Sequence, residues 1–196
     1  MSSSRVAHVT RIRDPHARHA ATHRRVLGAA AQLLDESARP DVSVPELAAR
    51  ARVAPTALRA HFPSMDAVYA ELYLQHVTAL PLTVDTSAPV ADRVATQLSA
   101  VALILADRPG LAHACTAALL STGDPAVAAA RSRIAAEVRR RLGAALGTGA
   151  WPEVLDTLET LFWGALLQAQ SREIDYRAMA ERLATMVSLV VPEDDD

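Results

Sequence analysis

The sequence predicts an all-α protein of about nine helices. Of its 196 residues, 51% are hydrophobic, and alanine and leucine dominate while β-branched and aromatic residues are sparse, a composition that favours helices over strands. Apolar residues recur at spacings of three and four, which is the pattern of a helix that buries one face. Short stretches with proline or glycine separate these segments, and they indicate turns between the helices.

The composition also indicates where the chain works. Cys115 is the single cysteine, so no disulfide within the chain is possible, and the reducing cytoplasm is the expected location. No charge-free apolar run approaches the roughly 18 residues that a bilayer crossing needs. The first residues lack the apolar core of a signal peptide, and we therefore expect neither a membrane span nor a signal peptide.

Positive charge is concentrated near the N-terminus. Residues 1–62 hold ten arginines and five acids, a net charge of +5, whereas residues 63–196 hold ten arginines and 17 acids, a net charge of −7. The chain has no lysine. A basic head on an acidic body is the pattern expected if the head alone binds a polyanion, although helical surfaces also vary in charge by chance.

Residues 1–19 are expected to form a flexible basic arm, because they combine arginine, serine and proline with little periodicity. In this region His16, His19 and His23 follow the spacing H-x2-H-x3-H. That spacing could bind a metal ion, but no carboxylate or cysteine set lies nearby in sequence. We therefore expect solvated, partly protonated histidines, with no metal and no cofactor.

Two short helices joined by a tight turn are predicted within residues 43–62, S-V-P-E-L-A-A-R-A-R-V-A-P-T-A-L-R-A-H-F. Ser43 and Glu46 can form a capping box at the start of the first helix. Pro55 fits the first turn of the second helix, where its missing N–H is not needed. Longer helices are predicted on either side of this pair, over residues 20–37 and 65–80.

Three short pieces between Ala20 and Leu80 carry a family resemblance. They are A-A-A-Q-L-L, S-V-P-E-L-A, and A-L-R-A-H-F-P-S followed by an acid. At this spacing the segment resembles the N-terminal domain of TetR-family transcriptional regulators. The resemblance implies a helix-turn-helix DNA-binding domain over residues 20–80, with the motif at 43–62, and an effector-binding and dimerisation domain over 81–196. It implies a sequence-specific regulator that acts as a homodimer, a repressor released from a pseudo-palindromic operator by a small lipophilic effector.

The resemblance assigns the DNA contacts mainly to the second helix of the pair. There Leu58 and Phe62 face inward, so Thr56 and Arg59 are the residues expected to reach DNA, Arg59 through a phosphate or a guanine edge. His61 matches a family phosphate contact, with a structural role as the alternative. The expected DNA-binding residues are Ser43, Arg52, Pro55, Thr56, Ala57, Arg59 and His61.

Four positions depart from the family pattern. Arg52 stands where the turn usually has glycine, and Ala54 stands where a serine usually caps the recognition helix. A left-handed arginine costs about 1–2 kcal/mol, and the missing cap about 0.5–2 kcal/mol. Arg59 and Met65 stand in place of a tyrosine and a lysine that contact phosphate. These departures keep open an alternative function, a helical adaptor that has lost strong DNA binding.

Five further helices are predicted after residue 81. Asp124 is expected to cap the third of them, whose five arginines between Arg131 and Arg141 are expected to form a solvated or salt-bridged face rather than a second nucleic-acid site. The five helices are predicted over residues 90–107, 111–121, 125–146, 151–171 and 175–191.

Apolar stripes on the last two helices are expected to form the dimer interface that the resemblance implies, and a core within one chain is the alternative. The stripe residues are Leu155, Leu158, Phe162, Leu166, Met179, Leu183, Met186, Val187 and Val190.

Polar or aromatic residues on otherwise apolar helices are the effector-binding candidates, although packing or exposure explains each of them equally well. They are Tyr73, His113, Cys115, Trp163 and Gln168. They suggest a lipophilic ligand with few polar anchors. An enzyme is not expected, because the sequence has no Glu-x-x-His pair, no phosphate-binding glycine loop and no G-x-S-x-G motif.

Overall fold

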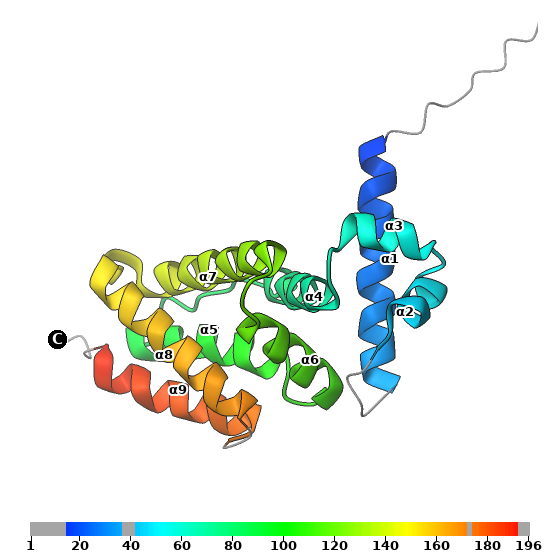
Figure 1. Cartoon of the computed structure of the whole chain (residues 1–196). Helices are drawn as coiled ribbons and strands as arrows, with labels where there is room; N and C mark the ends of the chain where they lie inside the picture. Colours follow the sequence, from blue (N-terminus) through cyan, green and yellow to red (C-terminus); the bar gives the residue numbers. More distant parts are fainter. Residues whose placement is uncertain (1–14, 37–41, 172–173, 192–196) are drawn as a thin grey trace, which may run out of the picture.

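Nine α-helices and no strand make up the regular structure of the described residues, which are 15–36, 42–171 and 174–191 of this computed structural model (Figure 1). The prediction of an all-α fold is thereby confirmed. A single turn of 3-10 helix, Gly147–Gly149, lies between the seventh and eighth helices. The helices are α1 (Pro15–Glu36), α2 (Val44–Ala51), α3 (Pro55–His61), α4 (Met65–Ala79), α5 (Val90–Leu103), α6 (Pro109–Leu120), α7 (Pro125–Leu146), α8 (Pro152–Gln170) and α9 (Tyr176–Val190).

Helices α1 to α3 form a head at one end of the molecule, and α4 leads from this head into a body made by α5 to α9 (Figure 1). In the head, α1 packs against α2, α3 and α4 through buried aliphatic side chains such as Val26 and Leu34. In the body, α5 packs against α7 and α9, and α4 packs against α6 and α7. None of the described helices combines the length and the apolar character that a bilayer crossing requires.

Side-chain caps fix where several helices begin. Ser64 accepts a hydrogen bond from the N–H of Ala67 at 2.9 Å, and Asp124 accepts one from the N–H of Ala126 at 2.8 Å. Each cap satisfies a backbone donor that the first turn of a helix leaves unpaired. The cap on Asp124 confirms the predicted start of α7.

Two predicted boundaries are wrong. Helix α1 already begins at Pro15, so residues 15–19 are helical and do not belong to an arm; residues 1–14 lie outside the described residues. The helices predicted over residues 90–107 and 111–121 leave Pro109 between them, but Pro109 occupies the first turn of α6, where proline is favoured. Helix α5 therefore ends at Leu103, and residues 104–107 form turns before α6.

Arg141 on α7 is buried, with 1% of its surface exposed, although the sequence placed it on a charged surface face. Its guanidinium donates hydrogen bonds to the carbonyl oxygens of Val77 at 3.2 Å and Leu80 at 2.6 Å. It also donates to the carbonyl oxygen of Pro81 and to the Glu137 carboxylate. These carbonyls lie at the C-terminal end of α4, where helical carbonyls lack intrahelical partners, so Arg141 fastens that end of α4 to α7.

The neighbouring arginines of α7 are paired at the surface, as predicted. Arg133 pairs with Glu71 at 2.8 Å, and Arg139 pairs with Asp156 at 2.5 Å. Arg140 shares the Glu137 carboxylate with the buried Arg141.

We expect the substitution Arg141→Met to lower the free energy of unfolding by about 2–4 kcal/mol, because the carbonyls at the end of α4 lose their donors in a buried place. Urea unfolding followed by circular dichroism measures this change. Arg140→Met is the matched control, since it removes an exposed partner of the same glutamate and should change stability by less than about 0.5 kcal/mol. Equal effects of the two substitutions would contradict the role given to Arg141.

Candidate functional site

The turn between α2 and α3 depends on a left-handed arginine. Arg52 has φ 53° and ψ 49°, and it is the one non-glycine residue with positive φ in the described ranges. Its N–H donates to the carbonyl oxygen of Ala49 at 3.1 Å, and the N–H of Val53 donates to that of Ala48 at 3.0 Å. These bonds end α2, and the left-handed conformation carries the steric cost of about 1–2 kcal/mol that a side chain brings there.

Helix α3 presents most of its surface to solvent. Its cap residue Ala54 makes no side-chain hydrogen bond, so the N-terminus lacks the usual cap, as the sequence indicates. Leu58 is the buried residue of α3, and Phe62 just after it is also buried, in agreement with the predicted packing role of both. Pro55, Thr56 and Arg59 are exposed, and Ala57 is half-buried. The outer side of α3 is therefore free to contact a partner.

Unpaired cations surround this exposed side. The side chains of Arg52 and Arg59 are exposed and make no hydrogen bond or ion pair with any described residue. Arg50 differs, because a bidentate pair with Glu36, at 2.7 and 2.8 Å, compensates its charge. Ser43 is exposed and accepts a hydrogen bond from the N–H of Glu46 at 3.3 Å, so its capping role is confirmed.

Histidines from α1 lie against His61 of α3 and against Phe62 at the edge of this surface, where the sequence suggested a solvated arm. The ring centroids of His19 and His61 lie 4.1 Å apart, and those of His23 and Phe62 lie 4.8 Å apart. Desolvation lowers the pKa of His23 and of His61, and nearby histidines lower both further. These two histidines are therefore neutral at neutral pH. The described residues contain no group of side chains suited to a metal ion, and the side chain of His16 lies outside them.

Met65 is half-buried and packs against the core. It therefore serves the joint between head and body rather than the basic surface.

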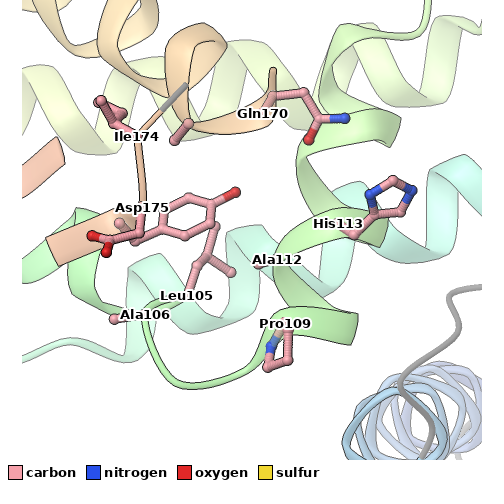
Figure 2. A pocket seen from close by; sticks show the side chains of 10 residues that line it. Leu105, Ala106, Pro109, Ala112, His113, Gln170, Ile174 and Asp175 are labelled. Carbon is pink, nitrogen blue, oxygen red and sulfur yellow. The ribbon is translucent and has the colours of Figure 1, made fainter. Parts of the chain in front are cut away.

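A cleft of about 420 Å³ opens in the body between the α5–α6 corner, α6, the end of α8 and the start of α9 (Figure 2). This volume lies within the range of small-molecule sites, roughly 300–1,000 Å³. His113, Gln170, Asp175 and Tyr176 supply its polar lining. Its apolar lining consists of Leu105, Ala106, Pro109, Ala112, Ala169 and Ile174.

Buried polar groups lie behind this cleft. The hydroxyl of Thr116 contacts Gln170 Oε1 and lies 3.3 Å from the hydroxyl of Tyr176. The hydroxyl of Tyr73 is buried and has no hydrogen-bond partner in the described part of the chain. Burial raises the pKa of Tyr73 and of the Cys115 thiol, so both stay neutral.

The five predicted effector-binding residues are thus divided. His113 lines the cleft, while Tyr73 and Cys115 are buried near Tyr176. Trp163 packs edge-on against the neighbouring Phe162, and Gln168 accepts a hydrogen bond from Arg182 at 3.3 Å. Neither of these last two lines the cleft. Sequence reasoning missed Gln170, Asp175 and Tyr176, for which the one available signal was a polar Asp-Tyr pair at the start of a predicted helix.

The stripe predicted as the dimer interface lies in the core of the single chain. Leu155, Leu158, Phe162, Leu166, Met179, Leu183 and Val187 are each at most 9% exposed, because α8 and α9 pack against each other and against α5, α6 and α7. These seven residues leave almost no surface for a second chain, so their assignment to an interface was wrong. Only Met186 and Val190 of the stripe are half-exposed.

Polar contacts tie the head to the body beside α4. Arg108, at the α5–α6 corner, forks onto Asp35 of α1 with distances of 2.8 and 2.7 Å. The Arg108 guanidinium also lies 3.3 Å from His76 Nε2 on α4. At the other end of α4, the cap residue Ser64 donates to Asp124, the cap residue of α7.

Helices α2 and α3 are joined by a tight turn, and the exposed α3 is flanked by unpaired arginines. With a helical body behind them, this arrangement is that of a helix-turn-helix DNA-binding protein. The comparisons agree. A family profile described as "Bacterial regulatory proteins, tetR family" matches residues 26–72. An HTH-type transcriptional regulator of Mycobacterium bovis, itself uncharacterised, is 43% identical over 186 residues, which cover 91% of this chain and 87% of the relative.

Two solved structures share the fold. A TetR transcriptional regulator from Rhodococcus sp. RHA1 superposes with a TM-score of 0.70 at 23% identity, covering 87% of this chain and 97% of that one. The multidrug binding protein EbrR, complexed with ethidium, superposes with a TM-score of 0.56 at 22% identity, covering 91% of this chain and 100% of that one. The chain belongs to the tetR family of bacterial regulatory proteins and is a DNA-binding transcriptional regulator.

We expect Arg52→Gly to raise the free energy of unfolding by about 1 kcal/mol, because glycine adopts the left-handed conformation without steric cost. Thermal or denaturant unfolding measures the gain. Arg52→Ala removes the same charge but keeps a Cβ atom, and it should leave stability nearly unchanged. A gain of the same size from alanine would show that charge, rather than backbone conformation, limits stability at this turn.

Proposed function

We propose that the protein is a repressor that binds a pseudo-palindromic operator as a two-fold homodimer and leaves it when a small lipophilic molecule occupies the body. The exposed outer side of α3, with Thr56 and the unpaired Arg59, carries the DNA-binding part of this proposal. In a helix-turn-helix dimer the second helix of each motif enters the major groove, and the two half-sites lie about 34–36 Å apart. Ser43, Arg52 and His61 border the same side and would contact the phosphate backbone.

The outward faces of α8 and α9 support the dimer. From Thr160 to Ser171 the chain carries no charged side chain, yet Gly164 and Leu167 are exposed there. Leu189 on α9 is 82% exposed and Leu167 is 53% exposed. The hydrogen bond from Arg182 to Gln168 joins the two outward faces into one surface. Exposed leucines beside an uncharged stretch of helix are typical of a protein–protein contact, so the dimer would use the side of α8 and α9 opposite to the buried stripe.

The cleft beside α6 is the site at which the effector would act. EbrR, which shares the fold, was solved with ethidium. In this chain the cleft lies next to Arg108, which holds α1 and contacts α4. A ligand changes DNA affinity only if it binds the DNA-bound and free arrangements unequally. A ligand that displaces the start of α6 would disturb the contact of Arg108 with Asp35.

Three features favour the alternative function of an adaptor that binds DNA weakly. The backbone of Arg52 is strained, and Ala54 gives the N-terminus of α3 no side-chain cap. Met65 packs against the core, so it does not contact phosphate. The DNA affinity of a variant at Arg59 separates the two functions.

Arg59→Ala should weaken binding to operator DNA about tenfold, in line with the roughly 1–3 kcal/mol that one base or phosphate contact contributes. The measurement is fluorescence anisotropy on DNA from around the gene itself, at several salt concentrations. Loss of a phosphate contact should also reduce the slope of log affinity against log salt concentration by about one. Loss of a base contact should instead relax the sequence preference. Arg140→Ala, in the body, is the control and should bind as the parent does. Unchanged binding by the Arg59 variant, or no sequence preference at any salt, would favour the adaptor.

Leu189→Asp combined with Leu167→Asp should convert the dimer to a monomer, because each chain would bury two charges in the interface. Analytical ultracentrifugation measures the mass. Leu120→Asp replaces a leucine of similar exposure to Leu167 at the end of α6 and should leave the dimer intact. A double variant that stays dimeric would place the interface on another surface.

A further inference from the structure

The charges around the cleft are unbalanced. Among the described residues that line it, Asp175 is the one carboxylate, and none is a lysine or arginine. Two arginines precede or follow lining residues in the chain, but each is already paired. Arg108 is bound by Asp35, and Arg177 contacts both carboxylate oxygens of Asp107 at 2.8 and 2.7 Å.

The Asp175 carboxylate is held in place. Asp107 and, less strongly, Asp175 raise the pKa of the nearby Arg177, but the Arg177 guanidinium is hydrogen-bonded to Asp107, so these three groups together keep a net negative charge. Asp175 Oδ1 accepts a hydrogen bond from the N–H of Ala178 at 2.7 Å, as the cap of α9. No cation in the described part of the chain forms an ion pair with it.

Figure 2 shows Asp175 and His113 at opposite ends of the group of lining side chains, with Leu105 and Ala112 between them. One end of the cleft therefore carries a fixed negative charge, and its middle is apolar.

We propose that this cleft binds a lipophilic cation, such as a long-chain or aromatic amine, with the ammonium group at Asp175 and the apolar part along Leu105, Pro109 and Ile174. The ring of Tyr176 on the same wall adds a surface that attracts a cation. The proposal rests on the proposed function only in that the bound cation would be the effector.

An anionic ligand does not fit these residues. A carboxylate or phosphate would enter a site whose one fixed charge has the same sign, with Arg108 and Arg177 occupied elsewhere. A neutral ligand of the same shape would gain the apolar contacts alone. The cleft should therefore rank ligands of one length by charge, with cations first and anions last.

Decylamine, decanol and decanoate test this ranking, because they share one alkyl chain and differ in charge at pH 7.5. Isothermal titration calorimetry on the full chain, without DNA, should give the tightest binding for decylamine and binding of decanoate at least tenfold weaker. Asp175→Asn should weaken the binding of decylamine about threefold to tenfold, as expected for a partly exposed charge, and leave the binding of decanol unchanged. Asparagine is as good a helix cap as aspartate, so α9 should stay intact.

Asp124→Asn is the matched control, since it removes the same charge from the cap of α7, which does not line this cleft. It should leave decylamine binding unchanged. The proposal is overturned if decylamine does not bind, if decanoate binds as tightly, or if Asp175→Asn has no more effect than Asp124→Asn.

A second measurement separates this proposal from the proposed function. Decylamine is added to the complex with operator DNA, and release is followed by anisotropy. Binding of decylamine in the ranking above supports the cleft assignment even if DNA is not released, whereas failure of release counts against the proposed repressor mechanism.

Discussion

The guanidinium of Arg141 holds the joint between the two parts of the molecule. Helix α4 belongs to both parts, since it packs against α1 of the head and against α6 and α7 of the body. A buried cation is tolerated only when its donors are bound, and here the carbonyls of Val77 and Leu80 bind them. The same contact satisfies carbonyls that a helix end leaves unpaired. Two groups that would each be costly alone thus stabilise each other, and the path of the chain after α4 depends on this pair.

The head gives up local stability beside the exposed side of α3. Arg52 adopts a conformation that glycine would take more easily, and Ala54 forgoes a capping bond. Both residues border the exposed side of α3. Arg52 is strained, but it adds a positive charge to that side. The packing core of the head, with Leu47, Leu58 and Phe62, is by contrast fully buried. Residues that depart from local conformational preferences at an exposed surface, next to a regular core, are typical of functional sites.

The sequence predicts the positions of the helices better than the surfaces they use. The helix Pro125–Leu146 is predicted to the residue, because Asp124 marks its start and Gly147 its end. An apolar stripe shows that a face is buried but not what covers it, which is why Leu158 and Phe162 were assigned to a partner chain although they lie in the core. Nothing in a run of three arginines distinguishes the buried Arg141. The cleft also escapes sequence reasoning, because residues as far apart in the chain as Thr116 and Tyr176 meet beside it.

Arg141 fixes the C-terminal end of α4, whereas the hydrogen bond from Ser64 to Asp124 and the ion pair of Glu71 with Arg133 join the rest of α4 to α7. If those two contacts break, α4 is free to rotate about its C-terminal end. With 15 residues, it is about 22 Å long, from a rise of ~1.5 Å per residue. A rotation of about 5° around the Arg141 end therefore moves the N-terminal end at Ser64 by about 2 Å. In the proposed dimer, two-fold symmetry would double such a displacement, so the two copies of α3 would change their separation by up to about 4 Å. That shift is comparable to the ~3.4 Å per base-pair step of DNA, so under the proposed mechanism a small rotation of α4 would put the heads out of register with their half-sites.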